Sequence, residues 1–147
     1  MAAGDIIWFE EARALDYFAG WATTDDIKVA VLDNTTAPTG GTTTPTLGDF
    51  TEVGAGGTYV AGGTSLGNWT TVWSEAAGTA KMDSTTNPTW AQDAGNDTDA
   101  YWGLIYNDTQ VTNPAIAFVE LGGPVDMSAG SLTITWNASG IATITAA

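Results

Sequence analysis

AYWGLIY at residues 100–106 and AIAFVEL at residues 115–121 are the most apolar stretches of the chain. The first is rich in aromatic and β-branched residues, and Gly103 would weaken a helix there. It is too short to cross a membrane, so it predicts a strand with both faces covered. The second stretch alternates between two sets of side chains that point to opposite faces: Ile116, Phe118 and Glu120, then Ala117, Val119 and Leu121. The polar loop between the two stretches predicts an antiparallel hairpin at the centre of the fold.

Short runs of alternating or β-branched residues recur along the rest of the chain, and turn residues separate them. They predict further strands over residues 26–33, 69–75, 80–83, 89–91, 132–136 and 141–145. Asn137 to Gly140 is a four-residue connection that ends in glycine, which predicts a last hairpin. Gly122, Gly123 and Pro124 are expected to end the central hairpin. This pattern predicts an all-β fold, an antiparallel β-sandwich of the jelly-roll type.

Residues 5–20, DIIWFEEARALDYFAG, give the one helix prediction. Asp5 can cap the helix, and Trp8, Ala12, Leu15 and Ala19 recur at helical spacing. The alternative stays open that Ile6 to Phe9 are extended instead. We expect a single domain over residues 1–147, with residues 1–20 as an N-terminal arm or helix.

The composition excludes several classes of function. The 147 residues include no Cys and no His, so most nucleophilic and general-base arrangements and the usual zinc and copper sites are unavailable. Seventeen acidic residues stand against three basic ones, and the net charge of −14 argues against nucleic acid and anionic membranes. No apolar run can span a bilayer, and we expect a protein made in a cytoplasm. The acidic surface either is merely solvated or complements a basic partner.

One acidic loop is a candidate calcium site, with oxygen ligands from Asp93, Asn96, Asp97 and Asp99. The spacing of these residues does not fit the helix–loop–helix calcium motif, and polar turns have the same composition. Carboxylate pairs of the glycosidase kind are unavoidable among so many acidic residues, and none is marked as perturbed. We therefore expect no enzyme activity, no cofactor and no metal.

The seven tryptophans are many for a chain of this length, and an exposed cluster of them could stack on sugars. Trp102 and Trp136 lie in regular strands and are expected in the core. Trp21, Trp69 and Trp90 border polar segments and are the candidates for exposed aromatic residues. A carbohydrate-binding module is therefore one alternative function.

The C-terminal half carries a series of short motifs. They are a Trp-Gly strand, an aromatic-Asn-Asp turn, an Ala-Phe strand, a Gly-Pro-Val step and a glycine turn before a last alternating hairpin: Trp102-Gly103, Tyr106-Asn107-Asp108, Ala117-Phe118, Gly123-Pro124-Val125, Gly130 and Leu132 to Ile144. The N-terminal half adds a short helix, the strand DIKVAVLDN and the segment DFTEVGAGGTYVAGG. In these features the chain resembles small virion structural proteins of tailed bacteriophages.

The resemblance implies a non-enzymatic protein that decorates or cements the capsid surface, with the major capsid protein or another virion protein as partner. A tail, fibre or adsorption component of the virion is the alternative within this class. A homo-oligomer is expected, with a trimer at the capsid threefold positions favoured. Ile6, Ile7, Trp8 and Phe9 are the expected protein-contact residues, because four consecutive large apolar side chains exceed what one side of a surface helix can bury. Packing of this segment onto its own sheet is an equally open interpretation.

Overall fold

The structure is a computed structural model that describes residues 6–8, 25–67, 69–74 and 79–145. Within these residues it is built from antiparallel strands, and its one helical element is the short 3-10 helix η1 (Leu47–Asp49). The strands are β1 (Ile6–Trp8), β2 (Ile27–Leu32), β3 (Thr64–Ser65), β4 (Trp69–Ser74), β5 (Thr79–Ser84), β6 (Thr89–Trp90), β7 (Ala100–Asn107), β8 (Ala115–Val125), β9 (Leu132–Thr133) and β10 (Ala142–Thr145). The prediction of an all-β protein is confirmed.

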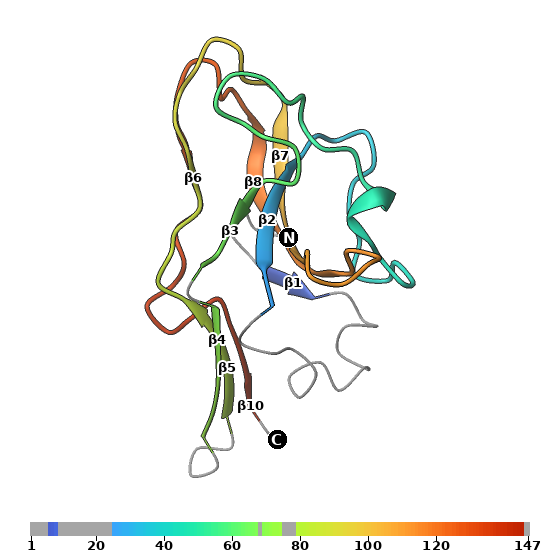
Figure 1. Cartoon of the computed structure of the whole chain (residues 1–147), viewed down its shortest axis with the longest axis vertical. Coiled ribbons are helices and arrows are strands. Elements are labelled where there is room, and N and C mark those ends of the chain that lie inside the picture. Colours follow the sequence, from blue (N-terminus) through green and yellow to red (C-terminus); the bar gives the residue numbers. More distant parts are fainter. Residues whose placement is uncertain (1–5, 9–24, 68, 75–78, 146–147) are drawn as a thin grey trace.

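The largest sheet has the strand order β1-β8-β7-β2-β3, so the predicted hairpin of β7 and β8 lies at its centre (Figure 1). β7 pairs with β8 through Leu104 and Phe118, and with β2 through Leu104 and Ala30. A second sheet, of order β10-β5-β4, extends away from the first, and β6 pairs with β9 in a third. The strands expected over residues 26–33, 69–75, 80–83 and 89–91 are confirmed as β2, β4, β5 and β6.

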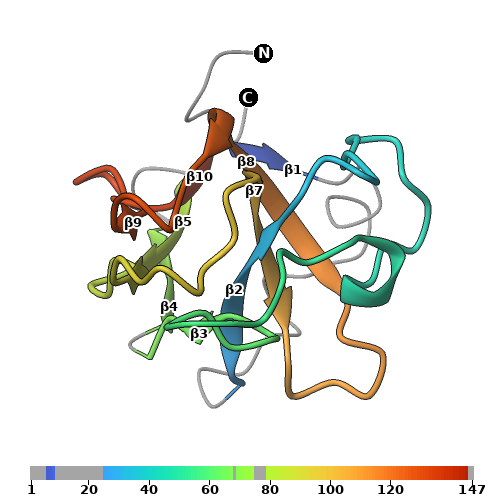
Figure 2. The same ribbon diagram turned by 90° about the horizontal axis from the view of Figure 1, so that it is seen from above.

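Successive side chains of a strand point to opposite sides, so the apolar residues of the five-stranded sheet pack on both of its faces. One face carries the larger hydrophobic cluster, which joins Ile27, Val29, Val31 and Ile105 to Trp90, Leu132, Ile134 and Ile141. The other face carries the smaller cluster of Leu32, Phe50, Leu104, Ala115 and Phe118. Seen from above, η1 lies on one side of the central strands and β9 on the other (Figure 2). The prediction that the central strand is covered on both faces is confirmed.

β8 departs from a regular strand at two places. The pairing with β7 shifts between Ile105 and Tyr106, so Ile116 is an extra residue and joins the larger cluster beside Ala117. This bulge overrides the predicted alternation at that residue. Further along, β8 continues through Gly122 and Gly123, which have φ angles of 94° and 111°. The expectation that these glycines end the strand is wrong, because glycine tolerates the positive φ that keeps the chain on course to Val125.

The N-terminal prediction is corrected where the structure describes it. Ile6–Trp8 form a strand that pairs with β8, Ile6 opposite Val119 and Trp8 opposite Ala117, so the predicted helix over residues 5–20 does not include them. The edge of β8 that does not pair with β7 supplies backbone hydrogen-bond partners to these residues, and this pairing makes them a strand. The remainder of that prediction, residues 9–20, lies outside the described residues.

The predicted C-terminal hairpin is also corrected. The turn forms, with the Gly140 amide donating to the Asn137 carbonyl at 2.8 Å. Its two flanks do not pair with each other, however, because β9 pairs with β6 and β10 pairs with β5. The strand predicted over residues 132–136 is therefore reduced to Leu132–Thr133, and the rest of that segment crosses over the larger cluster.

Candidate functional site

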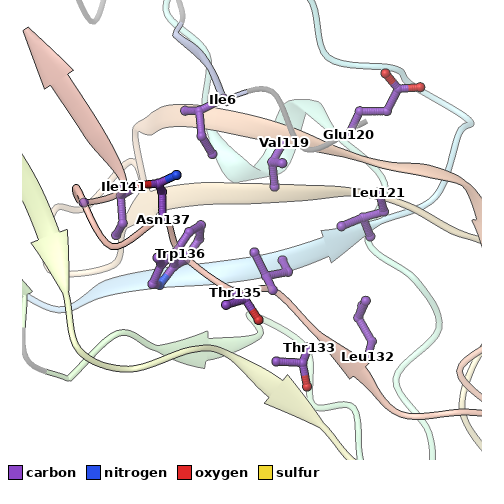
Figure 3. Close-up of a pocket in the computed structure, with 12 residues that line it drawn as sticks. Ile6, Val119, Glu120, Leu121, Leu132, Thr133, Thr135, Trp136, Asn137 and Ile141 are labelled. Atoms are coloured by element: carbon purple, nitrogen blue, oxygen red, sulfur yellow. The ribbon is translucent and has the colours of Figure 1, made fainter. Parts of the chain in front are cut away.

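A groove with a volume of about 540 Å³ lies between β8 and the C-terminal segment 132–141. Its lining comes from β1, β8 and that segment: Ile6, Val119, Glu120, Leu121, Leu132, Thr133, Ile134, Thr135, Trp136, Asn137, Gly140 and Ile141. Ile6 and Val119 point across the groove toward Trp136 (Figure 3). The volume falls in the range of about 300–1,000 Å³ that is usual for ligand sites.

The groove is apolar inside and polar at its margin. Its floor consists of buried aliphatic side chains, Val119, Leu132, Ile134 and Ile141. Ile6, Leu121 and Trp136 are half-buried and form the walls, packed against the larger cluster. Thr133, Thr135 and Asn137 are exposed and form the rim. An apolar floor with a polar rim is the anatomy of a contact surface for another molecule.

The segment that forms one wall of the groove is anchored to the turn before β6. The Ile134 amide donates to the Pro88 carbonyl at 3.0 Å, and the Trp136 indole Nε1–H donates to the Thr86 carbonyl at 2.9 Å. Under this segment Gly103 leaves the room that Ile134 needs, since a Cβ added at Gly103 would lie 2.8 Å from Ile134 Cδ1. The glycine in the central strand thus sets how closely the wall approaches the sheet.

One carboxylate marks the edge of the groove. Glu120 lies between Val119 and Leu121 on β8, and its carboxylate points away from the apolar floor (Figure 3). Lys28, by contrast, is occupied by internal acidic partners, because it donates to Asp108 at 2.5 Å and lies 3.8 Å from Asp26. The hydrogen bond to Asp108 raises the pKa of Lys28 above its ordinary value. Glu120 is thus the one charged residue in the lining of the groove, in a chain that is acidic as a whole.

The polar side chains of the candidate calcium loop form hydrogen bonds that hold neighbouring segments of the fold together. Asn96 is only 5% exposed, and its Oδ1 accepts from the amides of Thr58 at 2.9 Å and Tyr59 at 3.1 Å. Its Nδ2 donates to the carbonyls of Ala91 at 2.9 Å and Met127 at 3.3 Å. An amide side chain offers two donors and one acceptor oxygen, so Asn96 uses its full capacity to join three segments.

The acidic residues of this loop accept hydrogen bonds from the backbone. Asp93 accepts from the Gly95 amide at 2.8 Å, and Asp97 accepts from the Gly54 amide at 2.8 Å. In the part of the chain that the structure describes, no group of three or more acidic, His or Cys side chains is placed to hold a metal ion. Asp93, Asn96 and Asp97 thus form hydrogen bonds that hold the loop and its neighbours, and Asp99 is an exposed residue next to β7.

Two buried tyrosines, Tyr59 and Tyr106, form hydrogen bonds within the fold. The Tyr59 hydroxyl donates to Glu52 at 2.6 Å, and the Val31 amide donates to the same hydroxyl at 3.1 Å. The Tyr106 hydroxyl donates to the Gly62 carbonyl at 2.7 Å. Burial, strengthened for Tyr59 by the hydrogen bond to Glu52, raises the pKa of both phenols far above the ordinary value. Both therefore stay neutral and serve as structural hydrogen-bond donors.

The tryptophans are distributed differently from the prediction. Trp90 was expected to be exposed, and this is wrong, since it is 4% exposed and its ring centroid lies 6.1 Å from that of Tyr59. Trp102 and Trp136, expected in the core, are half-buried at its margins. Trp69 begins β4, where its side chain is outside what the structure describes, and Trp21 lies outside the described residues. Trp136 was not predicted at a site because Ile6 and the β8 residues that line the groove with it are distant along the chain.

Two of the N-terminal residues proposed to contact a partner pack against the core of their own chain. Ile6 packs against the larger cluster and Ile7 against the smaller one, so these two side chains pack onto their own sheet. Trp8 pairs with Ala117 through its backbone, and Phe9 lies outside the described residues. Ile6 in addition lines the groove, so the one sequence-selected residue placed at the candidate site also belongs to the core.

In the described residues, no helix has the length and hydropathy needed to cross a bilayer. Comparison with protein-family models, curated proteins and solved structures gives no significant match. The function is therefore argued from the groove, the charge and the sequence pattern of the chain itself.

Proposed function

We propose that this protein is a virion structural protein that binds and stabilises the capsid shell of a tailed phage as a decoration or cement protein. The observation that carries the proposal is the apolar groove at the margin of an acidic all-β domain, which offers a contact surface for another protein. On this proposal the protein acts at the capsid surface, with the major capsid protein as its partner and without catalysis.

The location of the phage-like motifs supports the same proposal. Trp102-Gly103 and Ala117-Phe118 belong to β7 and β8, the two central strands of the largest sheet. The last motif, from Leu132 onward, forms the wall of the groove. The residues that resemble phage structural proteins therefore form both the centre of the fold and the candidate contact surface.

We further propose that the sheets pack as a β-sandwich. Support comes from the larger cluster, in which Val29 and Ile105 of the five-stranded sheet meet Trp90 and Leu132 of the two-stranded sheet. The proposed assembly is a trimer at the capsid threefold positions, where repetition of a modest contact gives a large total affinity. On this proposal the N-terminal segment of Ile6, Ile7, Trp8 and Phe9 contacts the shell, and Ile6 reaches it from the groove, which it lines.

The test is reconstitution on shells of the phage that encodes the protein, prepared from a strain in which its gene is deleted. Purified protein is mixed with these shells, and the bound amount is measured after sedimentation through a gradient. A decoration protein binds to saturation at a copy number comparable with that of the major capsid protein, and it raises the temperature at which the shells open. Absence of binding to intact shells refutes the proposal.

The copy number in purified virions, measured by quantitative mass spectrometry, also decides between the capsid and the tail. A number far below that of the major capsid protein, with the protein recovered in isolated tails, would assign it to a tail, fibre or adsorption component.

Carbohydrate binding is the second candidate function, and one observation favours it. Trp136 is half-buried in the groove beside the exposed polar side chains of Thr135 and Asn137, a combination that sugar sites share. A glycan array, followed by titration of the tryptophan fluorescence with oligosaccharides, tests it. Saturable quenching in the wild type that is lost in Trp136→Ala would support this candidate over capsid binding.

A further inference from the structure

We propose that the groove between β8 and the segment 132–141 is the docking site for an extended segment of another protein, one that alternates aliphatic with basic side chains. The inference deepens the proposed function, because it names the surface and the partner chemistry through which the shell would be bound. It begins from the lining, in which seven of the twelve residues are apolar: Ile6, Val119, Leu121, Leu132, Ile134, Trp136 and Ile141.

The apolar lining selects the kind of side chain that enters. The floor residues Val119, Ile134 and Ile141 are aliphatic, and Trp136 has its Nε1–H committed to the Thr86 carbonyl. The floor of the groove thus offers hydrocarbon surface, and its hydrogen-bonding side chains stand at the rim. Each aliphatic side chain that reaches the floor leaves water and is stabilised by the hydrophobic effect, whereas a hydroxyl placed there loses hydration without a replacement hydrogen bond.

The groove lies along two chain segments, residues 119–121 of β8 and residues 132–137, so the segment we propose to follow it is itself extended. The groove follows β8 beyond Val119, where the pairing with β1 ends at Ile6 among the described residues. Gly122 and Gly123 have left-handed φ angles and Pro124 has no amide hydrogen, so this edge is a poor partner for a regular strand ladder. Recognition therefore rests on side chains that enter the groove.

Charge selects the partner. Glu120 is the one carboxylate among the residues that line the groove, and it stands at the edge with its carboxylate directed away from the floor. The whole chain carries a net charge of −14, so a second copy would meet repulsion, and a basic segment would meet attraction. The described base near the sheet, Lys28, is already paired with Asp108 and does not reduce this preference.

The direct test is fluorescence anisotropy of labelled peptides with the full-length protein. One peptide alternates valine and lysine, a second alternates threonine and lysine with the same charge, and a third alternates valine and glutamate. The valine–lysine peptide should bind at least about tenfold more tightly than either of the others. Equal affinity for the two lysine peptides would overturn the inference, because it would show a binding that depends on charge alone.

Variants locate the binding. Leu121→Lys places a positive charge in the wall of the groove, Thr135→Lys places one on its exposed rim, and Glu120→Lys reverses the edge charge. Each repels the lysine side chains of the valine–lysine peptide and should weaken its binding by about tenfold or more. Val111→Lys is the matched control, since Val111 is fully exposed in the loop between β7 and β8 and should leave binding unchanged. Thr135→Lys keeps the test valid if Leu121→Lys fails to fold. Wild-type affinity in Thr135→Lys and Glu120→Lys would overturn the inference.

Two further outcomes separate the groove from its alternatives. Competition by oligosaccharides would assign the groove to sugars, and a wild-type oligomer that Thr135→Lys dissociates would assign it to a second copy; either result overturns the inference. Shell binding is measured in parallel. If the peptides bind in the groove and the shells do not bind, the proposed function fails and the groove inference stands. If Thr135→Lys binds shells like the wild type, shells are bound elsewhere, so the proposed function stands and the groove inference fails.

Discussion

Replacing Asn96 by alanine is the most informative single perturbation of this fold. Its side chain is buried and joins the turn at Thr58 and Tyr59 to the carbonyls of Ala91 and Met127. Alanine removes every one of these hydrogen bonds and offers no replacement. The loops that they join would keep their covalent connections but lose the group that holds them together.

The expected loss in the free energy of unfolding follows from the buried groups that lose their hydrogen-bond partners. The bonds to the Tyr59 amide and the Met127 carbonyl are buried, so water does not reach them readily. A buried group deprived of its partner costs about 1–3 kcal/mol, which puts the loss in the free energy of unfolding at about 2–6 kcal/mol. A domain of this size has about 5–15 kcal/mol in total, so Asn96→Ala should be close to unfolding.

The assay is urea unfolding monitored by tryptophan fluorescence and circular dichroism. Asn137→Ala is the control, because Asn137 is exposed and its one described side-chain bond is to the Ser139 amide; it should change the free energy of unfolding by about 0.5 kcal/mol or less. A value for Asn96→Ala within about 1 kcal/mol of the wild type would refute the reasoning. It would mean that the three segments are held by other contacts and that Asn96 is dispensable.

Two further predictions concern the backbone and the buried phenols. Gly63→Ala should lower the free energy of unfolding in urea by about 3 kcal/mol or more, because the φ of Gly63 is +69° and an added Cβ would lie 1.9 Å from a carbonyl oxygen of β2. The control Gly130→Ala adds its Cβ in open space and should be nearly neutral. Equal effects of the two substitutions would contradict this prediction. Above pH about 10, Tyr59 and Tyr106 ionise in the unfolded chain but stay neutral in the folded chain. Their contribution to the free energy of unfolding is therefore complete below that pH, and above it the free energy falls by about 1.4 kcal/mol per pH unit for each phenol. Tyr59→Phe should make this fall shallower, as measured by urea unfolding at a series of alkaline pH values; an unchanged slope would show that Tyr59 ionises in the folded state.

The strongest sequence patterns predicted the centre of the fold. β2, β7 and β8 follow from apolar runs and alternation that are local properties of the chain, and burial on both faces follows from their composition. β1 was placed in a helix because its few apolar residues fit both periods, and only the edge of a distant strand decides between them. The last hairpin was mispaired for a related reason: the turn at residues 137–140 is local, whereas the partners of β9 and β10 are not.

The candidate site could not be read from the sequence in the same way. Its lining comes from β1, β8 and residues 132–141, segments that only the strand order brings together. Trp90 borders polar residues in the sequence, yet the ring of Tyr59 covers it. Asn96 stood out only as a member of an acidic loop, because its acceptors and donors lie in three separate segments. The acidic character of the chain, by contrast, could be read without the structure, since net charge is a property of composition.

The pairing of β1 with β8 has a consequence for how the protein is made. β1 comes from the first residues of the chain and β8 from the last third, and β7, which lies between β8 and β2, also emerges late. During synthesis the edge of β2 that pairs with β7 therefore stays unpaired until β7 leaves the ribosome. Contacts so distant in sequence fold slowly, so the yield of native protein in the cell should depend on how quickly and completely the last third is translated.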